Sequence, residues 1–90
     1  MSYKTIKAYA QAQIEERRSR FIGQIMPVSS ASEAIEFINS VKQKYSDATH
    51  NVYAYRIKDD TEKYSDDGEP GGTAGLPVMQ VLKNEELLNV

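Results

Sequence analysis

The sequence of 90 residues contains no cysteine and no tryptophan, and it contains a single histidine. Without cysteine there can be no disulfide framework, no thiolate nucleophile and no cysteine-based zinc site. No apolar stretch approaches the roughly 20 residues that a membrane-spanning helix needs. The chain starts Met-Ser-Tyr-Lys-Thr, which lacks the apolar segment of a signal peptide. We therefore expect a soluble, cytoplasmic protein.

An excess of charge of one sign is also missing. The chain has 11 lysines and arginines against 13 aspartates and glutamates, for a formal net charge of -2. This balance argues against a chain that is basic overall, as many nucleic-acid binders are, although a local basic patch is still compatible with it. A chain of this length accommodates one small core, so we assign residues 1–90 to a single domain.

Hydrophobic periodicity predicts an α+β fold. Apolar residues alternate over 6–14, as in a half-buried strand, and a capping box of Ser30 and Glu33 introduces a helix with apolar residues at helical spacing. Pro77 fixes the start of a second helix, because proline is tolerated only in the first turn. We expect a two-layer sandwich of order β-β-α-β-β-α with both helices on one sheet face. The expected ranges are strands over 6–14, 19–26, 51–58 and 62–65, helices over 31–45 and 75–83, and the start of a further strand over 87–90.

The single histidine, His50, lies between Thr49 and Asn51 at the predicted helix-to-strand junction. An imidazole in this polar setting can act as a general base or as a metal ligand. The alternative is a turn held by hydrogen bonds from the neighbouring polar side chains, with a half-exposed ring. A lone histidine seldom carries catalysis by itself, so the sequence alone favours the turn.

An acidic, glycine-rich segment follows over residues 65–75. Asp66, Asp67 and Glu69 fall within four residues and precede a predicted helix start, where free N–H groups favour an anion. The carboxylates suit a hard divalent cation, and a metal-bridged phosphate would reconcile both features. The segment is neither a Walker loop nor an EF-hand. The alternative is a rigid turn in which aspartates cap backbone N–H groups and glycines supply positive φ.

A basic run lies at the predicted turn between the first two strands, with Arg17, Arg18 and Arg20, and Arg56 is a candidate neighbour. Such arginines can hold phosphate or stack on bases beside exposed tyrosines. More often a run of this kind is a solvated strand edge that protects against aggregation.

Three segments in order, 16–22, 47–56 and 65–77, resemble the signature of the IMPACT/YigZ family. The resemblance implies the amino-terminal domain of a bacterial member, with a fold similar to the second domain of a small-subunit ribosomal protein. It also implies that the family's last strand is missing from the 90 residues. Eukaryotic members of this family regulate translation initiation, and a nucleic-acid or ribosome-linked role is the usual inference for bacterial members.

From the residues and the resemblance together, we expect a translation-linked regulatory or binding domain that contacts RNA, the ribosome or a translation-associated protein. One alternative is a metal-dependent hydrolase or phosphate-ligand enzyme that uses the acidic segment and His50, and another is a purely structural role. We assign no catalytic residue and no cofactor, although a divalent metal is compatible with the sequence, and we expect the chain to self-associate through an exposed sheet edge. The expected binding residues are Arg18, Arg20, His50, Asn51, Arg56, Asp66, Asp67, Glu69, Gly72 and Thr73.

Overall fold

The computed structural model describes residues 3–16, 19–47, 50–58, 60–67 and 74–90. It confirms the α+β class and the order β-β-α-β-β-α. The elements are β1 (Ala10–Glu16), β2 (Ser19–Ile25), α1 (Ala31–Lys44), β3 (Tyr53–Ile57), β4 (Thr61–Ser65) and α2 (Gly75–Asn84). Neither α1 nor α2, the helices of this described part, has the length and apolar composition needed to span a bilayer.

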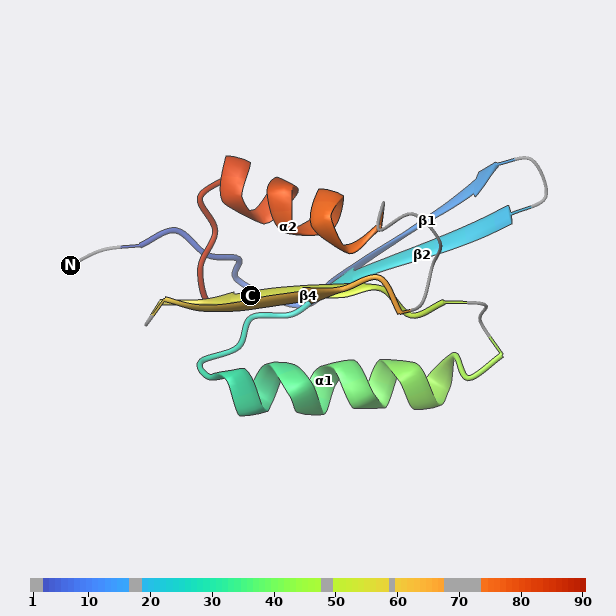
Figure 1. Cartoon of the computed structure of the whole chain (residues 1–90), viewed down its shortest axis with the longest axis horizontal. Helices are drawn as coiled ribbons and strands as arrows, with labels where there is room; N and C mark the ends of the chain where they lie inside the picture. The colour runs from blue at the N-terminus through green and yellow to red at the C-terminus, as the bar shows by residue number, and fades with distance from the viewer. Residues whose placement is uncertain (1–2, 17–18, 48–49, 59, 68–73) are drawn as a thin grey trace.

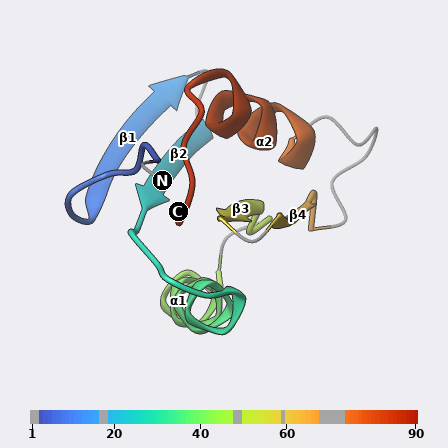
Figure 2. The same cartoon turned by 90° about the vertical axis from the view of Figure 1, so that its left-hand side faces the viewer.

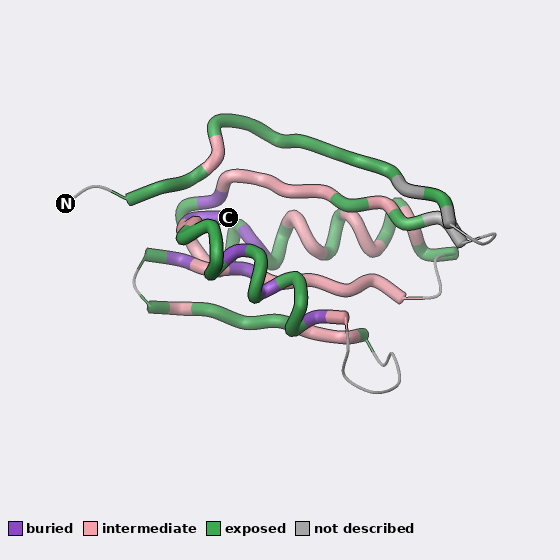
Figure 3. Tube along the Cα trace, turned by 90° about the horizontal axis from the view of Figure 1, so that it is seen from above, coloured by how far each residue is buried: buried purple, intermediate pink, exposed green. Residues whose placement is uncertain are grey.

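β1 and β2 form an antiparallel hairpin whose register pairs Ala12 with Gly23. The prediction of a half-buried first strand is wrong in two respects: the strand begins at Ala10, and its residues 10–13 and 15 are exposed on both faces. The physical reason is position. β1 is the outermost strand, and Figure 3 shows it as an exposed trace along one side of the molecule. An alternating pattern predicts which residues share a face, but burial requires another element to cover that face.

α1 forms as its sequence predicts. The Ser30 hydroxyl accepts a hydrogen bond from the Glu33 N–H at 3.2 Å, and the Glu33 carboxylate accepts from the backbone N–H and the hydroxyl of Ser29. One side of α1 packs against β3, which gives the small core. This core consists of Val28, Ala34, Tyr55 and Ile57, with Met26, Ala31, Ile38 and Tyr53 packed against it.

β3 and β4 pair in an antiparallel hairpin, and α2 lies on the side of this hairpin opposite to α1 (Figure 1). The expectation that both helices share one sheet face is therefore not met. Alternate side chains of β3 explain the arrangement, because Tyr55 and Ile57 pack toward α1 while Arg56 points to α2. α2 buries Met79 and Leu82 in its packing against β3 and β4.

The two hairpins form separate two-stranded sheets, and residues 87–90 lie between them (Figure 2). The Val28 N–H donates to the Asn89 carbonyl at 2.9 Å, and the Arg56 N–H donates to the Val90 carbonyl at 3.0 Å. Asn89 is itself buried, and its side-chain Oδ1 accepts from the Lys58 N–H at 3.0 Å. This segment, in place of the strand that the sequence predicts, connects the stretch after β2 to β3.

Candidate functional site

His50 and Asp67 meet, although 17 positions separate them in the chain: Nδ1 of His50 lies 3.0 Å from the backbone carbonyl oxygen of Asp67. A carbonyl oxygen can only accept, so Nδ1 carries the hydrogen and donates it. In the neutral ring this contact leaves Nε2 unprotonated and able to accept a hydrogen bond. The ring of His50 is only partly buried, so the contact fixes its tautomer without removing it from the surface.

The side chain of Asp67 makes a second connection between the same two segments. Its Oδ2 accepts a hydrogen bond from the Asn51 N–H at 2.5 Å, while its own N–H donates to the Ser65 hydroxyl at 3.1 Å. The backbone of Asp67 has a φ of 50°, a left-handed conformation that aspartate tolerates better than most residues. We call this set of four residues, His50, Asn51, Ser65 and Asp67, the His50–Asp67 junction.

Asp66 serves the next element. Its Oδ1 accepts hydrogen bonds from the N–H groups of Ala74 and Gly75, at 3.0 Å and 2.5 Å, at the start of α2. Ala74 occupies the N-cap position and its side chain makes no capping bond. The sequence predicts an anion at this helix start, and the structure identifies one in the chain itself, the carboxylate of Asp66.

These hydrogen bonds use carboxylate oxygens that a metal site in the acidic segment would need. Within the described ranges, no three His, Asp or Glu side chains lie close enough together to hold a metal ion. One carboxylate oxygen each of Asp66 and Asp67 already accepts backbone N–H groups. Glu69, the third carboxylate expected to take part, lies outside the described residues.

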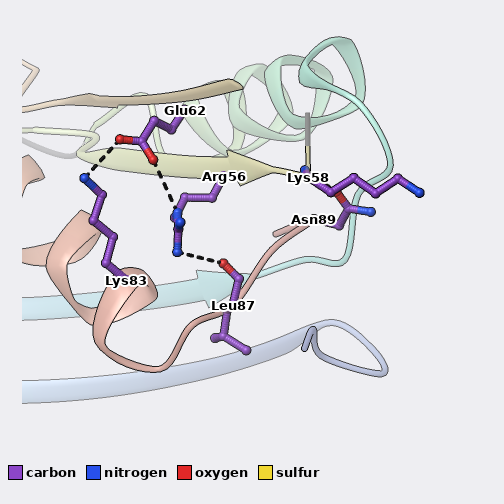
Figure 4. Close-up of polar contacts among 6 residues, drawn as sticks. All are labelled: Arg56, Lys58, Glu62, Lys83, Leu87 and Asn89. Carbon is purple, nitrogen blue, oxygen red and sulfur yellow. Dashed lines mark hydrogen bonds and ion pairs between the residues drawn. The ribbon is translucent and has the colours of Figure 1, made fainter. Parts of the chain in front are cut away.

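Arg56 belongs to a different part of the molecule. Its Nε lies 3.3 Å from Oε2 of Glu62, and Lys83 Nζ lies 3.0 Å from the other carboxylate oxygen, Oε1 (Figure 4). Arg56 Nη1 also donates to the Leu87 carbonyl at 3.3 Å. The contact with Lys83, together with the positive charges of Lys83 and Arg56, lowers the pKa of the Glu62 carboxyl. Arg56 therefore joins β3, β4 and the segment after α2 rather than the His50–Asp67 junction.

The remaining predicted site residues are placed in part. Arg20 is the second residue of β2, opposite Glu15 in the register, and this end of the β1–β2 hairpin points to the same end of the molecule as the start of β3 (Figure 1). Sequence reasoning missed Glu62, Lys83 and Asn89. Their partners come from other elements, and the spacing of residues along the sequence does not predict such pairs. Arg18, Glu69, Gly72 and Thr73 lie outside the described residues.

Comparison with known proteins explains the resemblance of the three segments 16–22, 47–56 and 65–77 to a family signature. The model of the Impact N-terminal domain matches residues 17–90. The chain is 46% identical over 88 residues to the IMPACT family member YvyE of Bacillus subtilis, a match that covers 96% of this chain and 41% of that protein. It is 38% identical over 72 residues to the IMPACT family member YigZ of Escherichia coli, with 76% of this chain and 35% of that protein covered.

The resemblance extends beyond bacteria. The chain is 34% identical over 85 residues to Protein IMPACT of Xenopus laevis, a match that covers 86% of this chain and 27% of that protein. It thus spans less than half the length of each of these relatives. The matched region contains the His50–Asp67 junction and the Asp66 cap of α2. The chain belongs to the IMPACT family, and it matches that family through the Impact N-terminal domain.

Proposed function

We propose that this chain is the binding domain of a translation-linked regulator. On this proposal, the end of the molecule that carries the His50–Asp67 junction contacts RNA, most directly on the ribosome. Membership of the IMPACT family supports the link to translation. The proposed setting is the cytoplasm, where translation takes place. A translation-associated protein in place of RNA is an outcome that the experiment below separates.

The observation that carries the proposal is the junction itself. Two polar segments, one before β3 and one after β4, are held together by hydrogen bonds at 3.0 Å and 2.5 Å while His50 and Asn51 remain partly exposed. A ligand that uses His50 meets a ring whose orientation and tautomer are already set, so little conformational entropy is lost on binding. β2, the strand that contains Arg20 in the sequence, begins at the same end of the molecule (Figure 1).

The test is salt-dependent binding. We expect the chain to be retained with single-stranded RNA on a filter and to co-sediment with ribosomes at about 50 mM salt, and to lose most of this binding by about 200 mM. His50→Ala should weaken the binding several-fold, because one positioned polar contact is lost. Asn39→Ala, an exposed change in α1, is the matched control and should bind as the parent does.

Three results would count against the proposal in different ways. Absence of binding to both RNA and ribosomes at low salt overturns it. Binding to isolated ribosomal proteins or to a translation factor, with no RNA present, would indicate a protein partner in place of RNA. If His50→Ala lowers the thermal midpoint but leaves the binding intact, the junction is structural, a role that the hydrogen bonds of Asp66 and Asp67 also support.

The alternative function, a metal-dependent hydrolase, is supported by fewer observations than RNA binding. A neutral His50 with an unprotonated Nε2 could accept a proton, but a metal-dependent hydrolase also needs carboxylate oxygens that are free to bind the metal. Calorimetry with Mg²⁺, Mn²⁺ and Zn²⁺ separates the two functions. Binding of one of these ions, with a rise of the thermal midpoint that Asp67→Asn removes, would favour the hydrolase.

A further inference from the structure

A hollow of about 540 Å³ lies beside the ion pairs of Arg56, away from the His50–Asp67 junction. It is lined by Arg56, Glu62, Lys83, Glu86 and Leu88, so its wall comes from β3, β4, α2 and the segment that follows α2. Two cations, Arg56 and Lys83, and two carboxylates, Glu62 and Glu86, therefore surround one hollow. Figure 4 shows Arg56 and Lys83 reaching the same carboxylate, Glu62.

Arg56 is only partly satisfied by its neighbours. Its side chain is 22% exposed, and its buried Nε makes no hydrogen bond, although Glu62 Oε2 lies 3.3 Å away as an ion-pair partner. The hydrogen bond from Nη1 to the Leu87 carbonyl is long, at 3.3 Å. A buried donor without an aligned acceptor is costly, and guanidinium has five donors to satisfy. The guanidinium of Arg56 can therefore donate further hydrogen bonds to a bound oxyanion.

Glu62 occupies the position that such an oxyanion would take. Its two oxygens divide between Arg56 Nε and Lys83 Nζ, so one negative charge serves two positive ones. The Glu62 side chain is 39% exposed and comes from β4, and rotation about its side-chain bonds would release both cations. Glu86 also lines the hollow, and it supplies a second negative charge that a ligand must overcome.

We propose that this hollow is a phosphoryl-group site in which Glu62 is a built-in competitor. A phosphoryl group carries up to two negative charges and three acceptor oxygens, which can reach Arg56 and Lys83 at once. A ligand carboxylate would only replace the charge of Glu62 and would also lose the entropy of association, so phosphate is the favoured chemistry. The site is distinct from the junction, and it does not depend on the proposed role in translation.

The experiment is an NMR titration of the chain with inorganic phosphate, followed at the amides of Arg56, Glu62 and Lys83. We expect weak binding to the parent chain, because Glu62 competes. Glu62→Gln should bind phosphate about three- to tenfold more tightly, and Lys83→Met in the same background should reverse the gain. The matched control is Glu85→Gln, which frees Lys4 from an exposed ion pair at 3.7 Å and should leave the affinity unchanged.

The source of the phosphate is tested with a single-stranded RNA that has no terminal phosphate. Shifts at the hollow with both inorganic phosphate and this RNA support the site and identify backbone phosphates as ligands. Shifts with inorganic phosphate alone also support the site, and they identify a small phosphorylated molecule as the ligand. Equal affinity of Glu62→Gln and Glu85→Gln, or shifts spread over the whole chain, overturns the site. The amide spectrum checks that each variant is folded. Loss of RNA binding at the His50–Asp67 junction would overturn only the proposed function.

Discussion

At the scale of single residues, the acidic segment shows where the sequence informs and where it does not. Asp66 and Asp67 stand next to each other and have different tasks: Asp66 caps α2, and Asp67 binds the N–H of Asn51. The sequence indicates a helix start that favours an anion, but the local N-cap position is Ala74, and the choice of Asp66 eight residues earlier depends on how the chain folds back. The contact with Asn51 cannot be predicted from local sequence either, because it depends on the return of β4 alongside β3.

Glu62 gives a prediction at the same scale. The contact with Lys83 and the charges of Lys83 and Arg56 lower the pKa of Glu62 in the folded chain. Because the folded pKa lies below the unfolded one, the ion pairs stabilise the fold above the unfolded pKa of Glu62, and this contribution is lost as pH falls through the folded pKa. We expect Lys83→Met to raise the midpoint of the Glu62 carboxyl resonance in an NMR titration. A midpoint that Lys83→Met leaves unchanged would contradict the assignment.

At the scale of elements, the order of strands and helices is predicted well and their environment is not. The capping box at Ser30 and Glu33 and the position of Pro77 in α2 are local signals, and both helices form where these signals indicate. The alternation of β1 is equally clear in sequence, but its cover depends on which element is placed beside it. Local chemistry therefore specified the elements, and long-range packing decided which faces are buried.

Gly75, the first residue of α2, gives the prediction for this scale. A Cβ at this position would lie 2.7 Å from the backbone oxygen of Ser65, in β4. Gly75→Ala should therefore destabilise the chain by about 1–3 kcal/mol, although alanine is the better helix former. Urea denaturation measures the loss. The matched control is Gly23→Ala in β2, where the nearest atom lies at 4.0 Å, and a loss there as large as at Gly75 would show that close approach is not the cause.

At the scale of the whole molecule, two hairpins are joined through a short segment, and the small core lies between β3 and α1. Residues 87–90 connect the stretch after β2 to β3, by the bonds of Val28 to Asn89 and of Arg56 to Val90. The placement of α1 and α2 on opposite sides could not be read from the chain, because both helices have an apolar face and either side of β3 could receive it. For the same reason, the sequence groups Arg56 with His50, while the structure places it with Glu62 and Lys83.

Apolar surface on this open arrangement leads us to expect self-association. Phe21 of β2 and Val81 of α2 are each 59% exposed, and residues 10–13 of β1 present both faces to solvent. Sedimentation velocity should show the mean mass rising with concentration up to about 100 µM. Val81→Lys should shift the chain toward monomer, because it removes apolar area, whereas Gln80→Lys adds the same charge on the same helix without this loss and should not. A monomer at every concentration, or equal effects of both substitutions, would show that this apolar surface does not drive contact between copies.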